Sequence, residues 1–174
     1  MRLNAIWKTA GSAALALAFV ATPVAALAQS NGTVVKAAEA RKLLPASVYY
    51  KGQSATTQLR NSGGVKFSDG YYVLATLVDN SGYSSDIAAR YQAYFITEVP
   101  LNIGGKTLPA GIYGVGFIGG HTFVVTDVGA HELLTTTYTN DTAIKRPLPL
   151  QILADPAGGY RLYSGRNWVH FSRR

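Results

Sequence analysis

The chain of 174 residues contains no cysteine and only one methionine. Without cysteine there are no disulfide bonds, no thiolate metal ligands, no cysteine nucleophile and no lipid anchor attached through a cysteine. A chain without disulfide bonds or metal sites of this kind must be stabilised by its hydrophobic core, and this chain is long enough to build one.

Basic charge is in excess but is nowhere concentrated. The chain has 16 Lys and Arg against 9 Asp and Glu, and its basic residues form isolated pairs such as Lys145-Arg146 and Arg173-Arg174. A nucleic-acid-binding protein typically carries a dense basic face. The sequence therefore predicts no nucleic-acid partner.

Long apolar runs are also lacking. Ala13–Val20 follows Arg2 and Lys8 and precedes the small-residue site Ala26-Leu27-Ala28. A run this short is typical of a signal peptide, because a membrane anchor needs about 20 apolar residues. We expect cleavage near Ala28 and export to the periplasm or the extracellular space, with no transmembrane segment in the mature chain.

The local motifs of common enzymes are missing as well. There is no G-x-x-x-x-G-K-[ST] loop for phosphate and no G-x-S-x-G nucleophile elbow. The histidines His121, His131 and His170 have no neighbours at metal-ligand spacing. We therefore expect no catalytic residue, cofactor or metal, and an enzyme of unrecognised type stays an alternative.

Turn signals and short β-rich runs dominate the chain after residue 46. The Asp69-Gly70 turn precedes Tyr71–Asp79, a run that is apolar on both faces and so predicts a central strand. Asn61–Gly64 reads as a turn, and the glycine-rich stretch 99–120 reads as strands separated by hairpin turns. These patterns predict an antiparallel β-sandwich or flattened barrel.

One helix is expected before these strands. Thr33–Leu44 is rich in alanine and leucine and is stopped by Pro45. The predicted organisation is a signal peptide at 1–28, an N-terminal segment with the helix at 29–45, and a single β domain at 46–174.

Two glycines give the first candidate binding feature. In the predicted strand 112–118, alternation puts Tyr113 on one face and both Gly114 and Gly116 on the other. Two missing side chains leave either a backbone-floored ligand groove or a place where neighbouring groups pack closely. We keep Tyr113, Gly114 and Gly116 as candidate ligand contacts.

The last strand gives the second candidate. Alternation turns Val169 and Phe171 inward, so Trp168 and His170 face the other way. We include Tyr163 and Arg166 with them, because aromatic and Arg side chains suit sugar rings, peptides or proteins. The alternative is that this face is simply covered.

Two stretches resemble known exported proteins. IGGKTLPAGIYGVGF, residues 103–117, resembles a strand-turn-strand element of exported bacterial proteins of unknown function. SVYYKGQSATTQLRNSGG, residues 47–64, is similar to the opening of small exported proteins of soil bacteria of the acidobacterial kind. The resemblance implies a compact β-sandwich or barrel in the cell envelope and implies no mechanism.

The sequence thus predicts an exported, non-enzymatic envelope protein that binds through an aromatic-lined sheet face. A small apolar ligand, a glycan and an envelope protein are all open as partners. A structural or assembly subunit of the envelope is the alternative function, and the oligomeric state is open.

Overall fold

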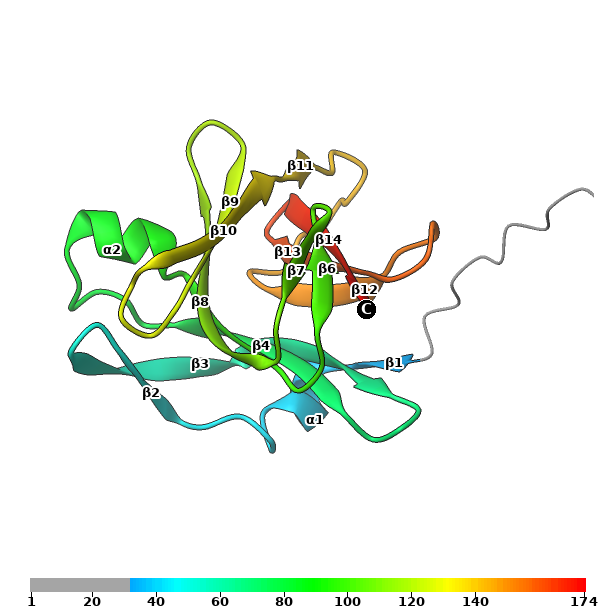
Figure 1. Ribbon diagram of the computed structural model, residues 1–174, viewed down its shortest axis with the longest axis horizontal. Coiled ribbons are helices and arrows are strands. Elements are labelled where there is room, and N and C mark those ends of the chain that lie inside the picture. The colour runs from blue at the N-terminus through cyan, green and yellow to red at the C-terminus, as the bar shows by residue number, and fades with distance from the viewer. Residues whose placement is uncertain (1–31) are drawn as a thin grey trace, which may run out of the picture.

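The apolar runs of the sequence form strands in the computed structural model, which describes residues 32–174. The strands build two antiparallel sheets that are not closed into a barrel, with 55% strand and 7% helix (Figure 1). Of the two expected architectures, the structure has the β-sandwich. The predicted signal peptide lies outside the described residues.

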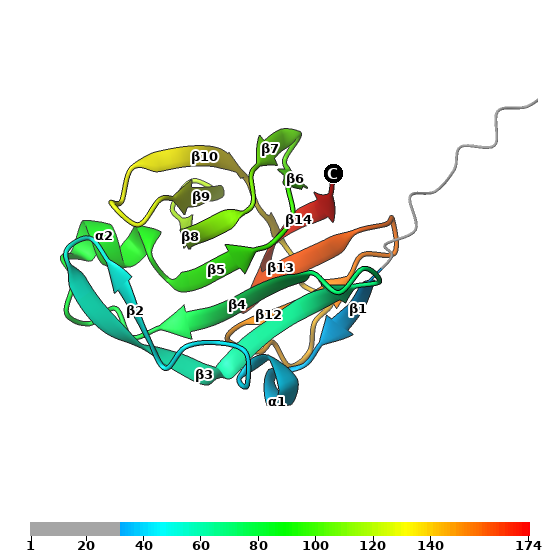
Figure 2. The ribbon, with the colours of Figure 1, turned by 60° about the horizontal axis from the view of Figure 1, so that its bottom comes forward.

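The first sheet has eight strands. Their order is β1 (Gly32–Val35), β3 (Gln53–Phe67), β4 (Tyr72–Val78), β5 (Ala93–Thr97), β8 (Gly111–Ile118), β9 (Thr122–Thr126) and β10 (Glu132–Thr137), and β2 (Ser47–Tyr50) pairs onto β3. Figure 2 shows this sheet lying across the other one.

The second sheet has six strands. Their order is β12 (Gln151–Ala154), β13 (Tyr160–Ser164), β14 (Asn167–Arg173), β6 (Leu101–Ile103) and β7 (Lys106–Leu108), and β11 (Thr139–Asn140) pairs onto β14. The glycine-rich stretch 99–120 leaves the first sheet after β5, forms the β6–β7 hairpin of the second, and returns as β8. The prediction of strands and turns in this stretch is confirmed.

The core has two layers, and β4 contributes to both. Val73 and Ala75 face the second sheet, where they join a large buried cluster that includes Leu101 and Phe171. Leu74 belongs to a second cluster on the opposite face, with residues from β2 and the two helices. The two apolar faces of this strand are thus both covered, as predicted.

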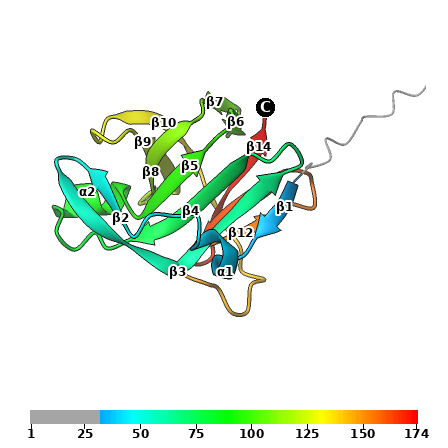
Figure 3. The ribbon, with the colours of Figure 1, turned by 90° about the horizontal axis from the view of Figure 1, so that it is seen from below.

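The predicted helix over Thr33–Leu44 is largely wrong. Only α1 (Ala37–Ala40) is helical, and the residues before it form β1, which pairs antiparallel with β3 from Gly32 to Val35. Val35 is buried in this position. The ladder of backbone hydrogen bonds therefore outweighs the helix propensity of an alanine-rich segment. Figure 3 shows α1 beside β3.

The predicted turn at Asn61–Gly64 is also wrong. These residues lie inside the 15-residue strand β3, where the pairing with β4 shifts between Gln58 and Ser62 as in a β-bulge. A Cβ on Gly64 would lie 2.5 Å from the carbonyl oxygen of Val73. Glycine is needed here for close packing of two strands.

One short helix lies between β4 and β5. This helix, α2 (Ser85–Arg90), has its N-cap at Ser84 and its C-cap at Tyr91. It packs mainly on β8.

Candidate functional site

The glycine face of β8 is filled by protein. A Cβ on Gly114 would lie 2.6 Å from the Tyr91 ring and 2.8 Å from the Tyr50 ring, and one on Gly116 would lie 2.5 Å from the carbonyl oxygen of Ala89 in α2. Tyr50 and Tyr91 are stacked, with ring centroids 3.7 Å apart. At these glycines the structure shows the close-packing alternative.

Tyr113 lies on the other face of β8, within the core between the sheets. Its side chain is 7% exposed, and its hydroxyl donates a hydrogen bond to the carbonyl oxygen of Pro109 at 2.9 Å. None of the three candidates on β8 therefore borders open space in this structure.

The outer face of the second sheet carries three of the remaining candidates, Tyr163, Trp168 and His170. The register places Arg161 of β13 opposite His170 of β14, and Tyr163 opposite Trp168. Because opposed residues share a sheet face, these four side chains lie together, while Val169 and Phe171 are buried on the inner face. The predicted alternation of β14 is confirmed.

Arg161 holds the indole of Trp168 from one side. Its guanidinium carbon lies 4.0 Å from the ring centroid, a cation–π contact. Asp155 fixes the guanidinium with two bonds, from Nε to Oδ2 at 2.8 Å and from Nη2 to Oδ1 at 2.9 Å. The bidentate geometry restrains the Arg161 side chain, which in turn restrains the indole.

The charges of this network are mutually stabilised. Hydrogen bonding from Arg161 holds the pKa of Asp155 below its usual value, and the same bond raises the pKa of Arg161. Burial raises the pKa of Tyr163, whose hydroxyl donates to Asp141 Oδ2 at 3.0 Å. Both ionised partners of the Asp155–Arg161 pair therefore persist at neutral pH.

Two of the predicted residues take no part in an open surface with Trp168. Tyr163 is only 2% exposed, because it is covered on this face of the sheet. Arg166 is exposed in the turn between β13 and β14, and its carbonyl oxygen accepts a hydrogen bond from the Asp141 N–H. Trp168 and His170 are the candidates that border a cavity.

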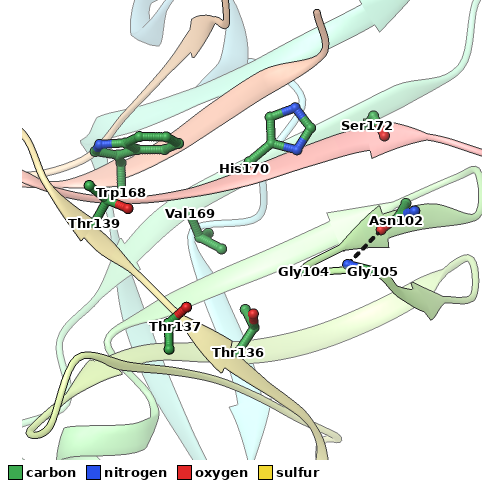
Figure 4. A pocket seen from close by; sticks show the side chains of 10 residues that line it. All are labelled: Asn102, Gly104, Gly105, Thr136, Thr137, Thr139, Trp168, Val169, His170 and Ser172. Atoms are coloured by element: carbon green, nitrogen blue, oxygen red, sulfur yellow. Dashed lines mark hydrogen bonds between the residues drawn. The ribbon is translucent and has the colours of Figure 1, made fainter. Parts of the chain in front are cut away.

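That cavity has a volume of about 370 Å³ and opens beside β14. Figure 4 shows Trp168 and His170 on one side of the strand and Val169 on the other, pointing toward Thr136 and Thr137 of β10. Its volume is at the lower end of the range found for small-molecule pockets.

The lining of the cavity is mixed in polarity and carries no carboxylate, Lys or Arg. Hydroxyl and amide side chains come from four strands: Thr136, Thr137, Thr139, Asn102 and Ser172. His170 contributes an imidazole whose Nε2 donates to the carbonyl oxygen of Gly158 at 2.9 Å, so that Nδ1 is left as an acceptor in the neutral ring. These groups suit an uncharged ligand with several hydroxyl groups.

The β6–β7 hairpin forms one wall of the cavity. Gly104 and Gly105 at its tip have φ values of +57° and +79°, as a type I′ turn requires. A Cβ on Gly104 would clash with the Thr136 side chain, and Lys106 Nζ donates to the Thr135 carbonyl oxygen at 2.9 Å. The hairpin is thus fastened to β10, and the wall is preformed.

Sequence reasoning missed the threonines and Asn102. The β-rich run Leu133–Tyr138 predicts a strand by its composition, but the register that brings these threonines beside β14 is set by contacts far along the chain. No local signal in the sequence reveals that juxtaposition.

A second titratable pair, Asp127 and His131, lies in the loop between β9 and β10. Asp127 Oδ2 lies 2.9 Å from His131 Nδ1, and its Oδ1 accepts from the backbone N–H of Gly129 and of His131. These bonds lower the pKa of Asp127. The pair is exposed and shapes the turn.

Among residues 32–174, no three His, Asp or Glu side chains gather closely enough to hold a metal ion. Within the same residues, no helix has the length and apolar character needed to cross a membrane.

Comparison with family models, with curated proteins and with solved structures finds no match to this chain.

Proposed function

We propose that this chain is an exported, non-enzymatic binding protein that holds a neutral saccharide in the cavity beside Trp168 and His170. The observation that carries the proposal is an indole restrained by Arg161 at the rim of a cavity lined by uncharged hydroxyl and amide groups. Saccharides present apolar C–H faces for an aromatic ring and hydroxyl groups for such side chains.

Preorganisation supports binding at this site. The Asp155–Arg161 pair fixes the indole, and the fastened hairpin fixes the opposite wall. A ligand entering a preformed site loses less free energy to the ordering of side chains. One indole face is covered by Arg161, so the proposal uses the other face and the ring edge.

The test uses the fluorescence of Trp168 to detect ligand binding. The chain has two tryptophans, Trp7 and Trp168, and Trp7 lies in the proposed signal peptide, so that Trp168 is the only indole of the mature protein, residues 29–174. We expect neutral oligosaccharides to change the Trp168 emission of the mature protein in a saturable titration. Absence of any change, together with no bound saccharide in native mass spectrometry, would refute the proposal.

Trp168→Ala supplies the matching variant. We expect it to weaken saccharide binding, measured by calorimetry, by about tenfold, the effect of a moderate hot-spot truncation. The melting temperature should change little, because the ring is only partly buried. A large fall in melting temperature with unchanged affinity would show that Trp168 is structural.

Export is the other half of the proposal. It rests on residues 1–28, which lie outside the described residues, and determination of the N-terminal residue of the native protein tests it. A first residue at Gln29 is expected.

A further inference from the structure

The edge of β14 is interrupted beside the cavity. β11 pairs with Asn167 and Trp168, and β6 pairs with Phe171 to Arg173. Between them, Val169 and His170 have no register partner on this edge among the described strands. The second sheet therefore lacks one rung of its ladder at this point.

The direction of the backbone groups at this gap follows from the flanking hydrogen bonds. The carbonyl oxygen of Arg166 accepts from the Asp141 N–H at 2.8 Å, and the N–H of Arg174 donates to the Pro100 carbonyl oxygen at 3.0 Å. In an antiparallel strand every second residue turns its backbone groups to the same edge. His170 lies four positions from both Arg166 and Arg174, so its N–H points to the same edge as theirs and into the gap.

The neighbouring strands leave a gap that is large enough only for a small chemical group. The β6–β7 hairpin turns away at Gly104 and Gly105, and its tip packs on Thr136. Because β11 and β6 occupy both flanks of β14, an added peptide strand has no room to pair beyond one residue. A single amide group fills a space of this kind.

We infer that the gap receives the acetamido group of an N-acetylhexosamine, an inference that rests on the proposed saccharide function. An acetamido group is a secondary amide and carries the donor and acceptor of one peptide unit. Its carbonyl oxygen accepts from the His170 N–H, and its own N–H donates to one of the threonine hydroxyls that line the cavity.

Groups described above would contact the rest of the sugar. Its ring contacts the face of Trp168 that Arg161 leaves uncovered. Asn102 Oδ1 accepts from the Gly105 N–H at 3.0 Å, so its amide NH₂ is directed to other acceptors, such as a sugar hydroxyl. Together these contacts name the ligand class: a neutral amino sugar with its nitrogen acetylated.

The experiment compares two matched trisaccharides on the mature protein, residues 29–174. A β-1,4-linked trimer of N-acetylglucosamine should bind about tenfold more tightly than the β-1,4-linked trimer of glucose, because the second lacks the acetamido donor and acceptor. Equal affinities would overturn the inference and leave the saccharide function standing. If neither trimer nor any other neutral saccharide binds, the proposed function itself fails.

Two substitutions at one position isolate the backbone N–H. His170→Ala removes the imidazole and keeps the N–H, whereas His170→Pro removes both. Proline is tolerated at a strand edge where its missing N–H points away from the ladder. We expect His170→Pro to bind the acetylated trimer about tenfold more weakly than His170→Ala, and equal binding would contradict the role of the N–H.

A third measurement decides the matter if the proline variant does not fold. In the chain that retains His170, the ¹⁵N–¹H resonance of this residue should shift on addition of the acetylated trimer and not on addition of the glucose trimer. An unmoved resonance with the acetylated trimer bound would overturn the inference.

Discussion

Substitution of Gly116 by alanine tests the packing of α2 on the first sheet. The added Cβ would lie 2.5 Å from the Ala89 carbonyl oxygen and 2.8 Å from two backbone atoms of Arg90, where ordinary contact begins near 3.4 Å. Because these are backbone atoms, α2 must move as a unit. We expect a loss of about 1–3 kcal/mol in the free energy of unfolding, the usual cost of overpacking.

The assay is thermal unfolding of Gly116→Ala beside Gly119→Ala. A Cβ on Gly119 would have no neighbouring atom within 4 Å, and the φ of this glycine lies outside the left-handed region. Both variants share the small entropic stabilisation that alanine gives over glycine, so their difference isolates the clash. We expect Gly116→Ala to melt about 4–10 °C below Gly119→Ala. Equal melting temperatures would refute the close packing of α2.

Two further predictions concern charge and the core. Hydrogen bonding from Arg161 lowers the pKa of Asp155, so the pair stabilises the fold above the usual carboxyl pKa of about 4 and this stabilisation is lost as the pH falls below it. Asp155→Asn should therefore lower the free energy of unfolding at pH 7. In urea unfolding, the free energy of unfolding of this variant should fall less between about pH 5 and 3 than that of the parent protein, and an equal fall would contradict this. Leu101→Ala, at a fully buried residue of β6, should cost about 2–5 kcal/mol in the same assay. Leu133→Ala, at a half-exposed residue of β10, should change stability by no more than about 0.5 kcal/mol, and similar losses for both would contradict the assigned core.

The fold was predictable where one local pattern had one structural meaning. Tyr71–Asp79 is apolar on both faces. A central strand covered on both sides is the structure that buries both faces, and β4 is that strand. The predictions of a helix over Thr33–Leu44 and of a turn at Asn61–Gly64 were wrong for one shared reason. Alanine favours helix and paired glycines favour a turn, but pairing with distant strands decided both segments.

The candidate site was predictable only in part. The period of two along β14 is sufficient to put Trp168 and His170 on one face. It does not show that Tyr163 is covered, that Asp155 fixes Arg161, or that threonines of β10 face the gap. Each of these depends on the register between strands that are distant in the sequence.

The position of β14 within its sheet also has a consequence for the order of events during synthesis. This strand lies between β13 and β6, which are separated by more than fifty residues of chain. The β6–β7 hairpin has no strand of the second sheet to pair with until residues 167–173 have been synthesised. Its apolar residues are therefore not yet buried against that sheet. Such long-range pairing is slow, and a nascent chain in this state exposes surface that a holding chaperone can bind.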